Sequence, residues 1–202
     1  MKLYFTPGAC SLSPHIALRE AGIGFDLEKV DLGKKQTASG ADYKAINPKG
    51  AVPALQLDDG QVLTEGAVIV QYIADRKPEA KLAPAAGKPE RYRLQEWLNY
   101  VATEIHKGIG PMFNPKLPAE AKAVLKEVLA AKFDFLAKKL DGKPYLMGNE
   151  FTVADGYLFT VLRWTKAHDI DLGKWPTLKA YVDRVAARPA VQSALKAEGL
   201  AN

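Results

Sequence analysis

The stretch from Asn47 to Ile73, NPKGAVPALQLDDGQVLTEGAVIVQYI, carries the pattern that decides the fold. Apolar and polar residues alternate at 55–57, and Asp59-Gly60 is a dipeptide typical of a tight hairpin turn. The short arm at 61–64 is rich in residues that favour strands. A helix is predicted from Glu65 to Arg76, directly after this arm. The stretch therefore predicts a partly buried β-hairpin followed by a helix.

The loop before the hairpin contains a Val52-Pro53 bond, which is a candidate for the cis isomer. A cis bond here would turn the backbone of Val52 outward, where its N–H and C=O groups can pair with an extended ligand. After the hairpin, the acidic Glu65 precedes backbone N–H groups that a new helix leaves unpaired. The sequence therefore predicts a site for a peptide-like ligand that carries both an ammonium and a carboxylate.

The residues before this stretch predict a β-α-β unit. A short strand is expected at 2–5, a helix at about 11–22 and a second strand at 25–30. Because such a crossover is right-handed, the two strands should be parallel neighbours. With a short helical turn at 41–45 and the hairpin unit, the order β-α-β-α-β-β-α indicates a thioredoxin-like domain.

The rest of the chain is helical in pattern after a segment at 78–88 that is rich in proline, alanine and glycine. Thr152 and Asp155 have the spacing of an N-capping box. We therefore expect a thioredoxin-like domain at 1–77, a linker at 78–88 and an all-helical domain at 89–202. The clearest apolar stripe at helical spacing consists of Leu94, Leu98, Val101 and Ile105.

The bulk composition excludes several classes of protein. Of the 202 residues, 48% are apolar and 25% are charged, which is ordinary for a globular protein. No apolar run approaches membrane-spanning length and the start lacks the apolar segment of a secretory signal, so we expect a cytoplasmic protein. The single cysteine excludes intramolecular disulfides and cysteine-rich zinc sites. The net charge of +5 comes from scattered lysines, which favours solvated helix faces or steering of anionic ligands over nucleic-acid binding.

Two further residues complete the pattern of a known family. Cys10 follows the first strand, and His106 lies in the first helix of the second domain. Together with the Pro53 loop and Glu65, they make the whole chain resemble a cytosolic glutathione transferase of the bacterial beta class. The resemblance implies a thioredoxin-like domain followed by an all-helical domain, and conjugation of the glutathione thiolate to electrophilic small molecules. Gly66 departs from the family pattern, which has a serine there whose hydroxyl contacts the γ-glutamyl carboxylate.

The resemblance also assigns roles to individual residues, and it implies a homodimer in detoxification, with glutathione as co-substrate and no metal. The candidate catalytic residues are Cys10, His106 and Ser11. Glutathione contacts are expected from Ala9, Cys10, Lys35, Val52, Pro53, Glu65, Gly66, Asn99, Thr103 and His106. An apolar co-substrate pocket has three candidate lining residues, Met112, Phe113 and Trp164. Such residues are also usual in a hydrophobic core.

Each catalytic candidate has a plainer alternative. Cys10 precedes a helix N-terminus, which favours a thiolate able to form a mixed disulfide with glutathione, but a lone cysteine is also a common small core residue. Ser11 can stabilise a thiolate by hydrogen bonding or serve as an N-cap. His106 shares a helix face with Asn99 and Thr103 by its spacing, and that face either lines the ligand site or is simply solvated.

Two other functions remain open from the sequence. In the first, Cys10 cycles covalently in glutathione-dependent thiol–disulfide exchange or peroxide reduction. In the second, the chain is a non-enzymatic ligand-binding or regulatory protein with the same fold. Replacing Cys10 distinguishes the first from conjugation, and failure to bind glutathione would indicate the second. The sequence does not reveal the electrophile, because its recognition depends on the shape of a pocket.

Overall fold

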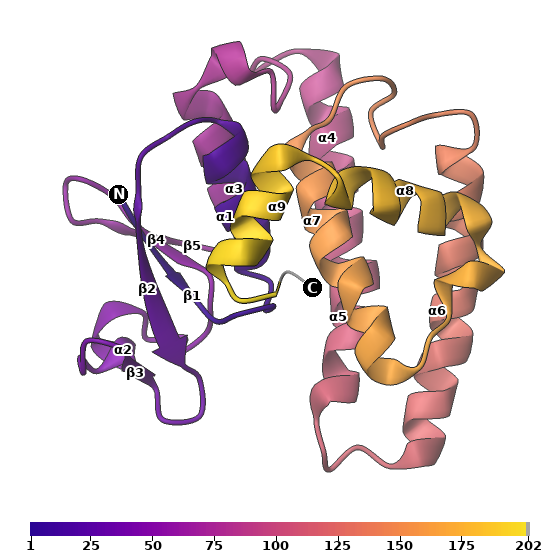
Figure 1. Ribbon diagram of the computed structural model, residues 1–202, viewed down its shortest axis with the longest axis horizontal. Helices are drawn as coiled ribbons and strands as arrows, with labels where there is room; N and C mark the ends of the chain where they lie inside the picture. Colours follow the sequence, from indigo (N-terminus) through magenta and orange to yellow (C-terminus); the bar gives the residue numbers. More distant parts are fainter. Residues whose placement is uncertain (201–202) are drawn as a thin grey trace. The chain divides into compact units, whose positions relative to one another are not determined.

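The computed structural model describes residues 1–200, and the chain divides into two compact units (Figure 1). Unit 1 comprises Met1–Ala85 together with the chain from Arg188 onward. Unit 2 comprises Ala86–Ala187. This division agrees with a thioredoxin-like unit followed by an all-helical one, and so confirms the predicted fold class.

The last helix of the chain belongs to unit 1, which differs from the predicted helical domain at 89–202. This helix packs against the first helix of the chain, and its buried residues include Val191 and Leu195. Packing of an apolar face, rather than position in the sequence, therefore decides to which unit the segment belongs.

A five-stranded sheet forms the centre of unit 1, with strands β1 (Lys2–Phe5), β2 (Asp26–Asp31), β3 (Gln36–Thr37), β4 (Ala54–Gln56) and β5 (Val62–Thr64). The strand order is β3-β2-β1-β4-β5. β1 and β2 are parallel, as predicted for the β-α-β unit, and the other three pairs are antiparallel. The predicted hairpin is confirmed as β4 and β5, with Leu55 opposite Leu63. Strand β3 was not predicted, because two residues are too few to show the alternation of apolar and polar residues that is typical of a strand.

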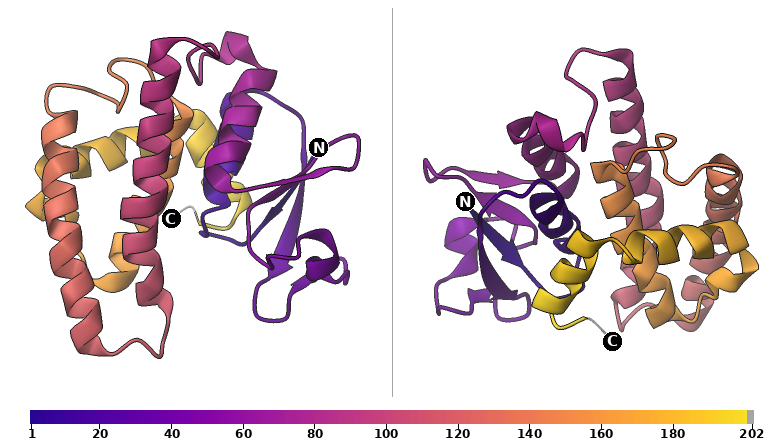
Figure 2. Two further views of the ribbon diagram at one scale, coloured as in Figure 1. Left: turned by 180° about the vertical axis from the view of Figure 1, so that it is seen from behind. Right: turned by 45° about the horizontal axis from the view of Figure 1, so that its top comes forward.

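Four helices accompany the sheet, namely α1 (Leu12–Glu20), α2 (Tyr43–Ile46), α3 (Gly66–Arg76) and α9 (Pro189–Ala197). Alternation along β1 determines which face of the sheet each helix covers, since neighbouring strand residues point to opposite faces. The Phe5 ring lies 6.3 Å from the His15 ring of α1, whereas the Tyr4 ring lies 5.7 Å from the Tyr43 ring of α2. α1 and α2 therefore cover opposite faces. α3 and α9 both pack beside α1 (Figure 2).

Unit 2 is helical throughout. Its elements are α4 (Pro89–Tyr100), η2 (Val101–His106), α5 (Lys107–Ile109), η3 (Gly110–Phe113), α6 (Ala119–Leu140), α7 (Val153–Leu162), η4 (Arg163–His168), η5 (Leu172–Lys174) and α8 (Pro176–Ala186). The run from α4 to η3 forms one column, and α6 returns beside it (Figure 2). In the predicted linker segment, residues Pro78–Ala80 form a short 3₁₀ helix, η1.

Helix α7 is the centre of unit 2, because all of its residues are buried. Its start is the predicted N-capping box, in which Thr152 and Asp155 bond reciprocally. The first backbone N–H groups of a buried helix cannot donate hydrogen bonds to water. The capping box provides acceptors for them within the protein.

The column containing α4 is not a regular α-helix, because η2 is a π-helical turn. The predicted apolar stripe is nevertheless buried, from Leu94 through Ile105. A π turn holds more residues than an α turn, so α-helical spacing does not describe the faces of residues that follow it. Within residues 1–200, no helix is both long enough and apolar enough to cross a membrane.

Candidate functional site

The first part of the site lies in unit 1, at the junction between β1 and α1. Cys10 is partly exposed there, and its Sγ donates a hydrogen bond to the carbonyl oxygen of Val52, 3.1 Å away. The Val52-Pro53 peptide bond is cis, as predicted. A carbonyl oxygen can only accept, so in this contact the Cys10 thiol is the hydrogen-bond donor.

The ends of the hairpin bring the predicted ligand loop and Glu65 together. Ala54 is opposite Thr64 in the sheet, so the residues that flank them, Pro53 and Glu65, are neighbours. Glu65 has a φ of 68°, an uncommon conformation for a residue with a side chain, and its carbonyl accepts from the N–H groups of the first turn of α3. The Glu65 carboxylate is thereby presented at the start of a helix.

A lysine already occupies this carboxylate. The Lys49 ammonium donates to Glu65 Oε1 and also to Thr64 Oγ1, at 3.0 Å. Both charged side chains are well exposed, so the pair is easily exchanged for a similar cation. Lys49 was not predicted, because a lysine in a loop before a hairpin has no sequence signal that separates it from other surface lysines.

Gly66 is not required by packing. A Cβ atom at this position would lie 3.7 Å from Pro53 Cγ, which is an ordinary contact distance. A serine would therefore fit, and its absence removes a hydroxyl without relieving any clash. Lys35, the predicted contact for the glycine carboxylate, is partly buried and donates from Nζ to the carbonyl of Gly50 at 2.8 Å.

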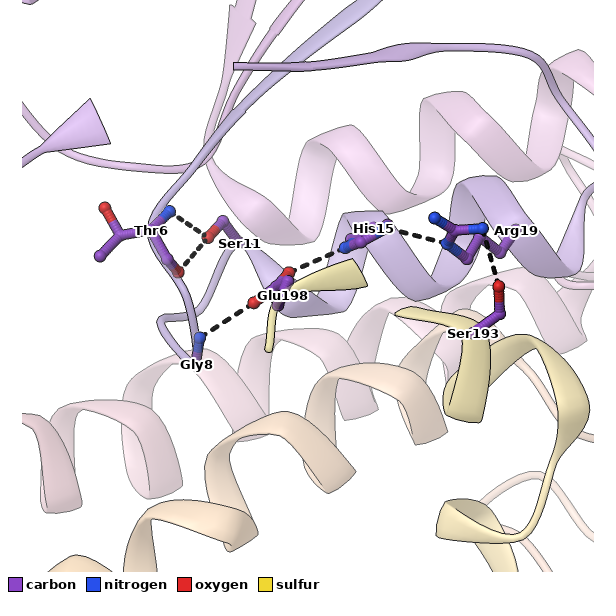
Figure 3. A network of polar contacts seen from close by, with 7 residues as sticks. All are labelled: Thr6, Gly8, Ser11, His15, Arg19, Ser193 and Glu198. Carbon is purple, nitrogen blue, oxygen red and sulfur yellow. Dashed lines mark hydrogen bonds and ion pairs between the residues drawn. The ribbon is translucent and has the colours of Figure 1, made fainter. Parts of the chain in front are cut away.

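A buried network fixes the segment that precedes Cys10 (Figure 3). The Glu198 carboxylate accepts from the Gly8 N–H at 2.9 Å and lies 2.8 Å from His15 Nδ1. Arg19 donates from Nε to His15 Nε2 at 2.9 Å, so that nitrogen carries a lone pair and Nδ1 carries the proton. His15 is therefore a structural residue that links Glu198 to Arg19. Glu198 gave no signal in the sequence, because its partners lie near the other end of the chain.

Ser11 occupies the N-cap position of α1, but its side chain does not cap the helix. Its hydroxyl accepts from the Thr6 N–H at 3.1 Å and donates to the Thr6 carbonyl at 3.2 Å, and the helix start has no side-chain cap. The predicted N-cap is thus confirmed in position but not in its side-chain hydrogen bond, because the Ser11 hydroxyl reaches back to Thr6. Its candidate role at a thiolate stays a prediction, and Ala9 lies in the turn before it.

The second part of the site lies in unit 2, around His106. Its Nδ1 lies 2.6 Å from the hydroxyl of Tyr157, and its ring meets that of Trp164 at 4.9 Å between centroids in an edge-to-face arrangement. Burial, with a smaller contribution from the positive charge of Lys107, lowers the pKa of His106 to about 4. His106 is therefore a neutral imidazole at physiological pH. Tyr157 was not predicted as its partner, because the two residues are far apart in the sequence.

Aromatic residues continue from His106. Phe113 is 51% exposed and meets the rings of Trp164 and His168 edge to face, with centroids 5.6 Å and 4.4 Å apart. Met112 is almost wholly buried and belongs to the interior. Of the three candidates for a co-substrate pocket, Phe113 is the one that presents a large apolar surface.

Asn99 and Thr103 are exposed, and the Thr103 hydroxyl donates to the Asn99 carbonyl at 3.0 Å. His106 differs from both in being partly buried. The π turn between them interrupts the α-helical spacing on which their common face was predicted. In the part of the chain that the structure describes, no group of three or more histidine, cysteine or acidic side chains is placed to hold a metal ion.

Comparison with known proteins gives the family. Models of the N-terminal and C-terminal domains of glutathione S-transferase match residues 8–76 and 100–189. The chain is 50% identical over 200 residues to Glutathione S-transferase GstA of Escherichia coli O157:H7, covering 99% of this chain and 100% of that protein. A sphingomonad glutathione S-transferase solved in complex with glutathione is 49% identical over 100% of both chains, with a TM-score of 0.96. The bacterial beta class glutathione S-transferase of Sphingomonas chungbukensis is 49% identical, with a TM-score of 0.96 and coverage of 99% of this chain and 100% of that one. The chain therefore belongs to the glutathione S-transferase family of transferase enzymes, in its bacterial beta class.

Proposed function

We propose that this transferase conjugates the thiol of glutathione to electrophilic small molecules, as a detoxification enzyme of the cytoplasm. The observation that carries the proposal is the grouping of Cys10, the Val52-Pro53 loop and Glu65 at one end of the sheet. The Val52 backbone would pair with the cysteinyl part of glutathione by strand addition, as in other extended peptide ligands. A sphingomonad relative, 49% identical, was solved in complex with glutathione, which supports this ligand.

The two ends of glutathione find complementary charges in this arrangement. The γ-glutamyl ammonium would take the place of the Lys49 ammonium on Glu65, which is an exchange of like charges. The γ-glutamyl carboxylate would accept from the Gly66 N–H at the start of α3, where the helix dipole is positive. The glycine carboxylate would meet Lys35. Ala9 and Cys10 would lie beside the cysteinyl part of glutathione. Asn99 and Thr103 would make further contacts with glutathione.

His106 would stabilise the glutathione thiolate. When the Tyr157 hydroxyl donates to Nδ1, the other ring nitrogen, Nε2, carries a proton that can be donated to sulfur. A hydrogen bond to the charged form lowers a thiol pKa and raises the fraction of thiolate at neutral pH. No metal takes part in this mechanism. Phe113 and Trp164 would line the space for the electrophile, whose apolar part suits aromatic walls.

The experiment that tests the proposal compares the wild type with Cys10→Ala. Conjugation of chlorodinitrobenzene should be largely retained in the variant, because the thiolate that attacks is that of glutathione. Intact-protein mass after treatment with oxidised glutathione should show one glutathione adduct in the wild type and none in the variant. Loss of conjugation in the variant would instead indicate covalent cycling of Cys10. Absence of both conjugation and glutathione binding in the wild type would indicate a binding protein.

The position of Gly66 gives a gain-of-affinity prediction. Gly66→Ser should tighten glutathione binding by about two- to tenfold, because one added hydrogen bond contributes about 0.5–1.5 kcal/mol. Titration calorimetry measures the change. Gly66→Ala is the matched control, since it adds the Cβ without the hydroxyl, and the packing leaves room for both. If alanine tightens binding as much as serine, backbone stiffening rather than the hydroxyl contact is responsible.

We propose that the enzyme is a homodimer through an apolar face of unit 2. On α6, Val124, Val128 and Phe135 are exposed and lie on one side of the helix by their spacing. The Phe135 ring packs against Trp97 and Tyr100 of α4, at 6.2 Å and 5.2 Å between centroids, which extends the apolar surface. Exposed apolar patches of this kind mark interaction sites, and a second copy of the chain is the occupant that the family resemblance implies.

Val128→Glu should convert the dimer to a monomer, because a buried unpaired carboxylate is costly at an interface. Sedimentation velocity at several concentrations reports the mass. Ala197→Glu, at an exposed position of α9, adds the same charge elsewhere and should leave the mass unchanged. A monomer mass for the wild type would refute the proposed dimer directly.

A further inference from the structure

His106 is the last residue of the π-helical turn η2, Val101–His106. π turns are rare, and they occur mostly as single turns within α-helices, frequently at functional sites. Relative to an α-helix of the same sequence, such a turn changes the direction in which the following side chains project. The His106 ring, at the end of this turn, meets Tyr157 and Trp164.

A lysine from the neighbouring helix contacts the π turn at its backbone. Lys132 of α6 donates from Nζ to the carbonyl oxygen of Glu104 at 3.2 Å, and the same ammonium lies 2.7 Å from the Glu104 carboxylate. Its side chain is only 23% exposed, so the contact is shielded more than a surface ion pair. A change of helix type disturbs the regular ladder of carbonyl acceptors, and a charged donor from outside stabilises one of them.

A second contact with α6 lies directly after His106. A Cβ atom at Gly108 would come within 2.7 Å of Leu129 Cδ2, which is closer than real contacts allow. The backbone at Gly108 therefore lies directly against α6. Leu129 and Lys132 are three residues apart and share one side of that helix. The contacts at Glu104 and Gly108 thus hold the chain on both sides of His106.

We infer that Lys132 is a positioning residue, whose bond to the Glu104 carbonyl maintains the π turn and so holds the His106 ring against Tyr157 and Trp164. This inference rests on the proposed action of His106 at the glutathione thiol. Lys132 acts through the backbone of η2, and the carbonyl contact, rather than the ion pair with the carboxylate, is the part that matters for the ring. Nothing in the reaction requires Lys132 to contact glutathione.

The environment of His106 provides a readout that does not depend on catalysis. The charged or titratable groups that face or adjoin His106 are Lys107 in its own segment and Tyr157 in α7. Burial against these neighbours is the main cause of its low pKa. If the turn reverts to an α-helix, the ring leaves this environment and its pKa moves toward the ordinary value of a solvated histidine.

The experiment follows the His106 imidazole by NMR during a pH titration of the full-length protein without ligand, with the signal assigned from a His106→Gln spectrum. Lys132→Met keeps the alkyl chain and removes the charge, and it should raise the pKa of His106 by about one unit or more. Lys132→Arg should restore the wild-type curve, since a guanidinium also reaches a carbonyl. Glu104→Gln removes the carboxylate but leaves the carbonyl, and it should titrate as the wild type does.

Conjugation rates complete the test. Lys132→Met should lower kcat/KM by about ten- to a hundredfold, the size of effect that follows small misplacement of a catalytic group, while Glu104→Gln keeps near-normal activity. Gly108→Ala, whose added Cβ would press on the Leu129 side chain of α6, should shift the His106 signal in the same direction as Lys132→Met. An unchanged His106 titration in a folded Lys132→Met protein would overturn the inference. If the wild type lacks conjugation altogether, the proposed function fails while the titration still decides the role of Lys132.

Discussion

Replacing His106 with phenylalanine is expected to lower kcat/KM for conjugation by about ten- to a hundredfold, because a hydrogen bond to a charged group contributes about 1.5–3 kcal/mol. Phenylalanine keeps an aromatic ring for the edge-to-face contact with Trp164, so unit 2 should remain folded. What disappears is the nitrogen that would donate to the thiolate. Steady-state rates with glutathione as the varied substrate measure the loss. The value of kcat should fall together with kcat/KM, while the affinity for glutathione should change little.

The pH profile separates this role from a general structural effect. Because the pKa of His106 is about 4, the ring is already neutral throughout the usual assay range, and its protonation contributes no inflection above pH 5. The wild-type profile should rise with the ionisation of the glutathione thiol, and in His106→Phe that inflection should move to higher pH. Tyr157→Phe removes only the hydroxyl at Nδ1, so it should give a smaller loss with the same direction of shift. A loss below twofold in His106→Phe, with an unshifted profile, would remove His106 from the mechanism.

Asp155→Asn is expected to lower the free energy of unfolding by about 2–5 kcal/mol, a large effect for one atom exchanged. Oδ1 of Asp155 accepts from the Leu146 N–H at 2.8 Å and the Tyr181 hydroxyl at 3.0 Å. Oδ2 accepts from the Thr152 N–H at 2.8 Å and the Thr152 hydroxyl at 2.9 Å. An amide has one acceptor oxygen, so its NH₂ group would face two buried donors.

Urea unfolding followed by circular dichroism measures the change, with the slope of the transition reporting whether the unfolding remains two-state. Asp141→Asn is the control, because that carboxyl is exposed at the end of α6 and its replacement should change stability by less than about 0.5 kcal/mol. An equally stable Asp155→Asn protein would mean that the box contributes little once the helix is packed.

The sequence predicted those parts of the molecule whose signal is local. The alternation at Leu55 and Leu57 around Gln56, followed by Asp59-Gly60, is sufficient for a hairpin because strand period and turn chemistry act over a few residues. The spacing of Thr152 and Asp155 is sufficient for a capping box for the same reason. The cis peptide at Val52-Pro53 was also predicted, from the position of proline at a strand entrance.

Other parts depend on contacts that no local pattern contains. The pairing of His106 with Tyr157 arises because α7 is buried beside η2, and neither residue differs in its sequence context from an ordinary helical residue. The π turn could not be predicted, because Leu98, Val101 and Ile105 have the spacing of an ordinary α-helical stripe. The same residues are buried in the structure, so their pattern does not distinguish the two helix types. Lys49 contacts Glu65 and Lys132 contacts Glu104, but neither lysine differs from other lysines in its sequence context. Their partners are therefore known only from the structure.

The return of α9 to unit 1 gives the protein an unusual order of maturation during synthesis. The Cys10 segment is among the first made, yet Gly8 and His15 wait for the Glu198 carboxylate, which is made near the end. At about 5–20 residues per second, the ribosome takes roughly ten seconds to make the intervening helical unit. This unit is contiguous in the sequence, so it can fold before α9 is made. A nascent chain therefore carries Cys10 on a loop that lacks the Glu198 contacts until α9 emerges. The loop before Cys10 gains these contacts only in chains whose translation has passed Glu198, so prematurely released chains lack them.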